Sequence, residues 1–202
     1  LISLHDHNEE QRAKQIIEKL KLGQSIALIS DAGTPLISDP GYGLVSQCRE
    51  HGLQVVPLPG PCAAITALSA AGLPTDRFRF EGFLPVKQQA KQQALELLAQ
   101  ESATAVFYES PRRVVDTVAE IVNVLGEGRK VVLAKELTKA FETFFSGTAG
   151  EALAWLEEDS NHQRGEFVLM ISGYKNTSSD VPAEALSLLK SLMEEMPLKK
   201  AA

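Results

Sequence analysis

The chain has 202 residues, of which 44% are hydrophobic and 23% charged, a balance typical of a globular protein with a substantial core. Its net charge of −6 excludes a surface coated in basic residues, so any contact with nucleic acid must be a local patch. Two cysteines without a CxxC motif argue against a disulfide scaffold or cysteine-based zinc site and favour a reducing, cytoplasmic compartment. No apolar run is long enough to cross a bilayer. The chain opens on Leu1 rather than Met, and we expect it to be a segment of a longer protein.

Residues 1–76 alternate between helical and strand patterns, which predicts an N-terminal α/β domain. The short apolar runs 25–30 and 53–58 predict buried strands, each followed by a loop and a helix. Such repeated units predict a parallel sheet with helices on its faces. Helices are predicted around 13–20, 42–51 and 62–72, each ending near a glycine.

Residues 77–175 predict a second α/β domain with a mixed sheet. Ser110 and Pro111 have the residue types of an N-cap and a first helical position, so a helix is predicted from there to 126. Residues 176–202 predict a linker at 176–180 and an accessory helix at 183–195. Strands are predicted at 78–83, 103–109, 130–137, 142–148 and 165–173, with further helices at 87–100 and around Trp155.

Two loops follow the predicted N-terminal strands, at 31–41 and 59–62. Ligands of open α/β sheets bind outside the carboxyl ends of strands, and both loops are rich in small residues that let a ligand approach the backbone. Neither loop contains a GxGxxG or GxxxxGK[ST] motif, which disfavours recognition through a pyrophosphate or triphosphate. A nucleoside-like ligand stays open, and so does the alternative that both are merely tight turns.

Other chemically active side chains allow two interpretations each. His5 and His7 could bind a metal, but no supporting cluster follows, and a cap or surface role is favoured. Cys62 could be a nucleophile, but the sequence places no base beside it, and a small residue in a tight turn is the favoured interpretation. The charged residues after two predicted strands could clamp a phosphate backbone or polarise a hydroxyl, or could form surface ion pairs: Arg112, Arg113, Lys135, Glu136, Lys139 and Glu142.

Five segments in order resemble the tetrapyrrole methylase superfamily: 30–41, 57–74, 107–113, 134–142 and 165–173. Within it, the chain is similar to the branch that methylates the ribose 2′-hydroxyl of a cytidine in small-subunit (16S) ribosomal RNA. This resemblance implies two α/β domains with S-adenosylmethionine in the cleft between them, no metal, and a homodimer. The superfamily's first strand and a loop would precede Leu1, so the N-terminal domain is expected to be incomplete, and a further region would follow Ala202.

The resemblance also implies site residues. Thr34 stands where many relatives that act on tetrapyrroles have Asp, which argues against such a substrate. Glu109, Lys135 and Glu136 are candidates to activate the hydroxyl, although a base from a preceding segment is an equal alternative. Arg112, Arg113 and Lys139 are the expected RNA contacts, together with Lys135. The cofactor is expected at Ala32, Gly33, Thr34, Pro35, Ile37, Gly60, Cys62, Ala63 and Leu137.

Rival interpretations are a methyltransferase of tetrapyrrole intermediates, the methylase of diphthamide synthesis, and a non-catalytic nucleoside-binding module. The segments 107–113 and 135–139, together with Thr34, speak against the first two. With a net charge of −6, free RNA should bind weakly, so a folded ribosomal subunit is the expected substrate.

Overall fold

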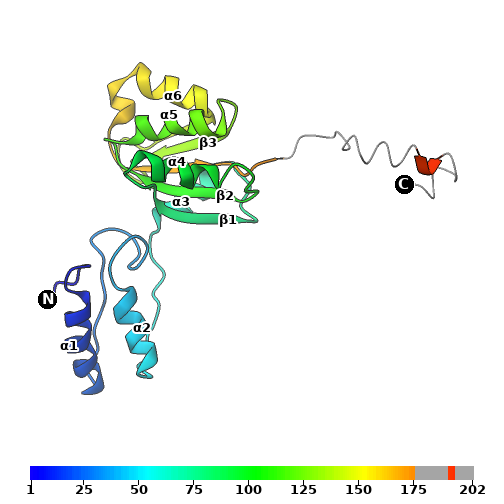
Figure 1. Cartoon of the computed structure of the whole chain (residues 1–202). Helices are drawn as coiled ribbons and strands as arrows, with labels where there is room; N and C mark the ends of the chain where they lie inside the picture. The colour runs from blue at the N-terminus through cyan, green and yellow to red at the C-terminus, as the bar shows by residue number, and fades with distance from the viewer. Residues whose placement is uncertain (176–190, 194–202) are drawn as a thin grey trace.

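The computed structural model describes residues 1–175 and 191–193 (Figure 1). The predicted linker at 176–180 lies outside the described residues, and so does the predicted accessory helix at 183–195 except for 191–193, which are helical. Within the described part of the chain, no helix is long and apolar enough to cross a membrane.

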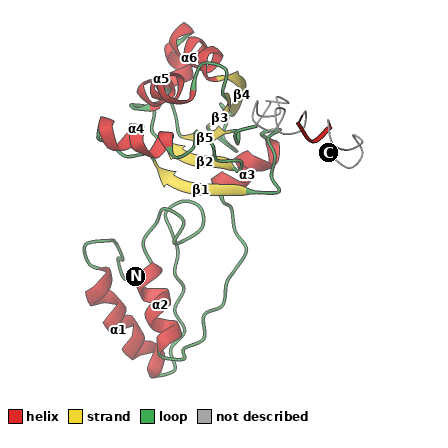
Figure 2. Cartoon of the chain, turned by 45° about the vertical axis from the view of Figure 1, so that its right-hand side comes forward, coloured by secondary structure: helices red, strands yellow, loops and turns green. Residues whose placement is uncertain are grey.

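Two helices lie side by side near the N-terminus, away from the sheet (Figure 1, Figure 2). Helix α1 spans Glu9–Lys21 and helix α2 spans Tyr42–Glu50, so both predicted helices are confirmed. The apolar residues of α1 recur at helical spacing and therefore form one stripe that packs against α2. The small core between them consists of Ala13, Ile16, Ile17, Leu44 and Cys48.

The two apolar runs at 25–30 and 53–58 belong to no strand, so the prediction of buried strands there is wrong. A strand forms only where a neighbour completes its hydrogen-bond ladder, and neither run pairs with a strand of the described residues. Several of their apolar side chains consequently stay in solvent, with Ile29 81% and Leu58 83% exposed, whereas Leu53 and Val55 pack against the small core between α1 and α2. The predicted N-terminal parallel sheet is therefore not formed by the described residues.

The α/β class rests on one five-stranded mixed sheet, in the order β1-β2-β5-β3-β4. Strands β1 (Phe78–Phe83) and β2 (Thr104–Glu109) are parallel. Strand β5 (Phe167–Ile171) runs antiparallel to β2 and to β3 (Lys130–Lys135), and β4 (Thr143–Thr148) is antiparallel to β3. The mixed C-terminal sheet is thus confirmed. The carboxyl ends of β1, β2 and β3 meet at one edge, beside the start of β5.

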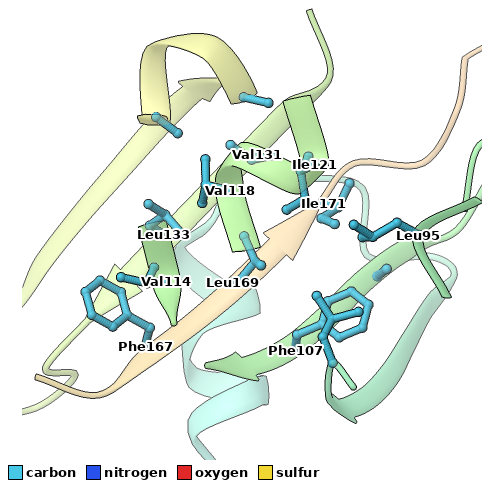
Figure 3. Packing of buried hydrophobic residues seen from close by; sticks show 14 of the residues in the cluster. Leu95, Phe107, Val114, Val118, Ile121, Val131, Leu133, Phe167, Leu169 and Ile171 are labelled. Atoms are coloured by element: carbon cyan, nitrogen blue, oxygen red, sulfur yellow. The ribbon is translucent and has the colours of Figure 1, made fainter. Parts of the chain in front are cut away.

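Helices cover both faces of this sheet. On one face lie α4 (Gln88–Glu96), α5 (Val114–Leu125) and α6 (Ala149–Glu158), and a short 3-10 helix (Ser160–Gln163) follows α6. The core on this face contains Leu95, Phe107, Val114, Val118, Ile121, Leu133 and Leu169 (Figure 3). This is the larger of the two cores on the sheet.

The opposite face is covered by α3 (Ala63–Ala70). Successive side chains of β2 point to opposite faces of the sheet. Phe107 therefore packs in one core, while Val106 and Tyr108 pack in the other. The domain boundary predicted at residue 76 would assign α3 to the N-terminal unit, yet α3 packs on the C-terminal sheet. The division of the chain at that residue stays a prediction.

Helix α5 begins at Val114, later than its residue types predict. Residues 111–113 instead form a turn in which the Arg113 N–H donates to the Ser110 carbonyl at 3.1 Å. The N-cap position therefore belongs to Arg113, and the assignment of Ser110 as the N-cap and Pro111 as the first helical residue is wrong.

Candidate active site

The two loops expected to hold the cofactor contact each other. The Thr34 hydroxyl donates a hydrogen bond of 2.8 Å to the Pro61 carbonyl, which joins the loop 31–41 to the turn 59–62. Gly33 has a φ of +82°, a conformation that side chains other than glycine rarely adopt. A side chain at Gly60 would meet no atom within 4 Å, so the backbone of the turn faces open space. The two loops thus offer an accessible backbone at one place.

One buried cluster connects these loops to the sheet. Cys62 and Leu137, which come from different loops, pack against the same buried cluster together with Tyr108. The Ala64 N–H, at the start of α3, donates to the Tyr108 hydroxyl at 3.3 Å. Burial is the main cause that raises the pKa of Tyr108, with Cys62 and Asp39 acting in the same direction. Its hydroxyl is therefore neutral and retains a proton to donate.

Sequence reasoning missed Tyr108. A signal was available, because strict alternation along β2 places Tyr108 on the face opposite Phe107, toward α3 and its preceding turn. Recognising which face of β2 meets the turn 59–62 would have singled out the tyrosine.

Backbone strain marks the loop 31–41 and the segment that follows β3. Within the described residues, the non-glycine residues with positive φ are Leu36 (72°), Ser38 (61°), Glu136 (52°) and Thr138 (63°). Each such conformation costs about 1–3 kcal/mol and persists only where surrounding contacts enforce it, often at ligand sites. All four fall in the predicted loop 31–41 and in the segment 134–142, one of the five that carry the family resemblance. Backbone geometry therefore supports these segments independently of residue type.

Glu109 is the last residue of β2, and its side chain is fully buried. Its oxygens accept hydrogen bonds from the Ser110 N–H at 2.8 Å and the Thr117 hydroxyl at 2.7 Å. The Arg113 Nε lies 3.4 Å from the same carboxylate. A carboxylate enclosed in this way holds the start of α5 in place and has no open side for a substrate.

The two predicted RNA-binding arginines differ in their surroundings. Arg113 is mostly buried, and its Nη2 donates to the Leu84 carbonyl at 2.6 Å, which ties the segment after β1 to the start of α5. Arg112 is exposed and lies in the turn between β2 and α5. Of the pair, Arg112 has the accessible side chain, and Arg113 supports the edge of the sheet.

The charged residues at the end of β3 form a connected group. Lys135 is buried and donates from Nζ to the Asn161 carbonyl at 2.6 Å. Glu136 accepts the Glu166 N–H at 2.9 Å and pairs with Lys139, also at 2.9 Å. These two interactions, with the backbone one as the larger, lower the pKa of Glu136 and keep it ionised. Lys139 pairs with Glu166 as well, at 3.0 Å.

The described residues contain no group of three or more His, Cys, Asp or Glu side chains that could hold a metal. The rings of His5 and His7 have centroids 6.1 Å apart, and the side-chain amide of Asn8 forms a hydrogen bond with the ring of His5. This N-terminal segment leads into α1.

Comparison with known proteins identifies the family. The family model of Tetrapyrrole (Corrin/Porphyrin) Methylases matches residues 3–153. The chain is 58% identical over 202 residues to ribosomal RNA small subunit methyltransferase I of Escherichia coli O157:H7, covering 100% of this chain and 71% of that protein. The protein of the same name from Vibrio cholerae serotype O1 is 55% identical over 201 residues, covering 99% of this chain and 70% of the relative. The chain belongs to the ribosomal RNA small subunit methyltransferase I family. The resemblance to the tetrapyrrole methylases is confirmed.

Solved structures agree on the fold of this ribosomal RNA small subunit methyltransferase I family member. Diphthine synthase superposes with a TM-score of 0.61 at 13% identity, over 85% of this chain and 68% of its own. The methyltransferase CobJ gives a TM-score of 0.59 at 18% identity, over 80% and 70% of the two chains. These likenesses concern the fold alone and confirm the tetrapyrrole methylase-like architecture.

Proposed function

We propose that this protein transfers a methyl group from S-adenosylmethionine to the ribose 2′-hydroxyl of a cytidine in small-subunit (16S) ribosomal RNA. The observation that carries the proposal is the identity of more than half the residues, along the whole chain, to proteins named for that ribosomal RNA. The contact between the loops 31–41 and 59–62 supports it, since the resemblance assigns both loops to the cofactor. Because ribosomal subunits are the proposed substrate, we place the activity in the cytoplasm.

The residues present fit S-adenosylmethionine. Open space at Gly60 and the left-handed backbone at Gly33 allow a nucleoside to approach main-chain groups. The Tyr108 hydroxyl offers one side-chain donor, and Cys62 and Leu137 supply apolar contacts. When bound, this cofactor supplies a methyl group already activated by a sulfonium. The chain's own task is to orient the hydroxyl in line with that methyl, about 3 Å away, and to exclude water.

Among the three predicted catalytic residues, we assign activation of the hydroxyl to Glu136. It adjoins Leu137 and stays ionised, so it can accept a hydrogen bond from the hydroxyl and polarise it. Its lowered pKa makes it a weak base, so its role is to orient and polarise the hydroxyl while the proton leaves. Lys135 donates to the Asn161 carbonyl and Glu109 is enclosed, so both position the edge of the sheet. Glu136→Gln should lower kcat about 100-fold or more. Binding of labelled S-adenosylmethionine should be unchanged, and the exposed Glu157→Gln should leave both unchanged.

Arg112 and Lys139 are the proposed RNA contacts beside this group. Arg112 is exposed, and Lys139 is 47% exposed despite its two carboxylate partners. Ion pairs at such exposure contribute about 0.2–1 kcal/mol, so a substrate phosphate can recruit the ammonium group. We also propose a homodimer, which size exclusion with light scattering tests directly: a monomer at working concentration would contradict it.

The proposed function is tested by methyl transfer from labelled S-adenosylmethionine. Small ribosomal subunits that lack the modification, naked ribosomal RNA and a porphyrin precursor serve as parallel substrates. We expect label in the RNA of the subunits and none when the target is already methylated. Label only in the precursor would assign the protein to tetrapyrrole chemistry, and cofactor binding without transfer to any substrate would favour a binding module.

A further inference from the structure

A cavity of about 440 Å³ lies at the edge of the sheet opposite the candidate active site. It is lined by the start of β3, by the segment that follows β5, and by residues that follow α3. Three cationic side chains line it, Arg129, Lys130 and Lys175, together with Tyr174, and among the described residues no acidic side chain does. In a chain of net charge −6, this is a local concentration of positive charge.

Arg129 lacks a counter-charge within the part of the chain that the structure describes. Its guanidinium is half-buried and donates to the Ser172 carbonyl at 3.1 Å and the Ala99 carbonyl at 2.9 Å, both neutral acceptors. Removal from water, the main cause, lowers the pKa of Arg129, yet arginine stays charged. Two fixed carbonyls orient the group but leave its positive charge uncompensated. An anion entering the cavity would supply the missing charge.

Tyr174 presents an aromatic ring beside this cation. The Arg129 guanidinium carbon lies 5.8 Å from the ring centroid, and Tyr174 is 45% exposed. The Tyr174 N–H donates to the Glu101 carbonyl at 2.6 Å, and Gly173 packs so closely on Ser102 that any side chain there would collide. The tyrosine is therefore held in place by the backbone. A fixed, half-exposed ring next to cations is the arrangement on which bases of single-stranded nucleic acid stack.

We propose that this cavity binds a single-stranded segment of the RNA substrate away from the target nucleotide. Arg129, Lys130 and Lys175 contact its phosphates, and a base stacks on Tyr174. The proposal rests on the proposed function for the identity of the nucleic acid. Strands of six residues separate the two edges of the sheet by about 20 Å. One RNA that reaches both edges is therefore a folded or extended structure, consistent with a ribosomal subunit as substrate.

The test compares two double variants that remove the same charge. Lys130→Gln with Lys175→Gln changes the cavity, while Lys14→Gln with Lys19→Gln changes the exposed face of α1. The affinity of each protein for a labelled single-stranded oligoribonucleotide is measured at several salt concentrations. For two lost phosphate contacts, the slope of log K against log [salt] should become shallower by about 1.4 in the cavity variant alone. Tyr174→Ala should weaken binding about 5-fold or more without changing that slope.

Equal effects of the two double variants would overturn the proposal, because they would show general attraction to positive charge. An unchanged slope in the cavity variant would overturn it as well. With ribosomal subunits, the cavity variant should raise KM and leave kcat unchanged. If the unaltered protein binds the oligoribonucleotide through the cavity but methylates no RNA, the proposed function fails while the cavity site stands.

Discussion

Thr117→Val removes one hydrogen bond from a buried carboxylate and leaves the packing almost unchanged. The Thr117 hydroxyl, itself fully buried, donates to Glu109 Oε2 at 2.7 Å, and valine has the same shape without the donor. A hydrogen bond to a charged group contributes about 1.5–3 kcal/mol, and burial prevents water from replacing it. We therefore expect the free energy of unfolding to fall by about 1.5–3 kcal/mol, measured as a lower urea midpoint at unchanged m-value.

Thr66→Val is the matched control, because Thr66 lies exposed on α3. The same substitution there should change stability by no more than about 0.5 kcal/mol. If Thr117→Val is as mild as this control, the carboxylate is not held as described and the reasoning is refuted. Glu109→Gln extends the test: it should lower stability while kcat per folded molecule stays unchanged. Full stability with lost activity would instead make Glu109 the catalytic base.

Two further predictions concern Glu136 and its surroundings. Gly165→Ala should destabilise the fold by about 1–3 kcal/mol, because Gly165 has a φ of +92° and a side chain there would collide with Glu136. The stability change is measured by thermal unfolding. Gly128→Ala is the control, because a side chain at Gly128 would meet no atom within 4 Å. Glu136→Gln tests pH dependence. The Glu166 N–H and Lys139 lower the folded-state pKa of Glu136 below its ordinary value, so the ionised carboxylate stabilises the fold at neutral pH. This contribution is lost as the pH falls through the folded-state pKa. The difference in urea midpoint between the original protein and Glu136→Gln should therefore shrink as the pH is lowered from 7 into the acid range in which Glu136 becomes protonated, and a constant difference would contradict this.

Local pattern determines much of this fold, and the exceptions have identifiable causes. Helix α1 follows from apolar residues at helical spacing, and β3 from a short apolar run. The run 25–30 has a similar strand pattern, yet a strand also needs a neighbour, which periodicity does not encode. The pattern identifies which residues can be buried, and tertiary pairing decides whether they are.

The candidate site shows the same division. Thr34 and Pro61 were both nominated from small-residue loops, and they meet although the strands expected before them do not form. The enclosure of Glu109 was not visible in the sequence, because its partner Thr117 lies eight residues further on, in a helix whose start was misplaced. Tyr108 was overlooked because its role depends on which face of β2 meets α3.

Nucleoside analysis of ribosomal RNA labelled by this protein tests the central claim most directly. Small subunits lacking the modification are incubated with methyl-labelled S-adenosylmethionine, and their RNA is digested to nucleosides and separated. The account predicts label in 2′-O-methylcytidine at one position, and loss of that label with Glu136→Gln. Label on a base, on another ribose, or undiminished in Glu136→Gln would contradict it.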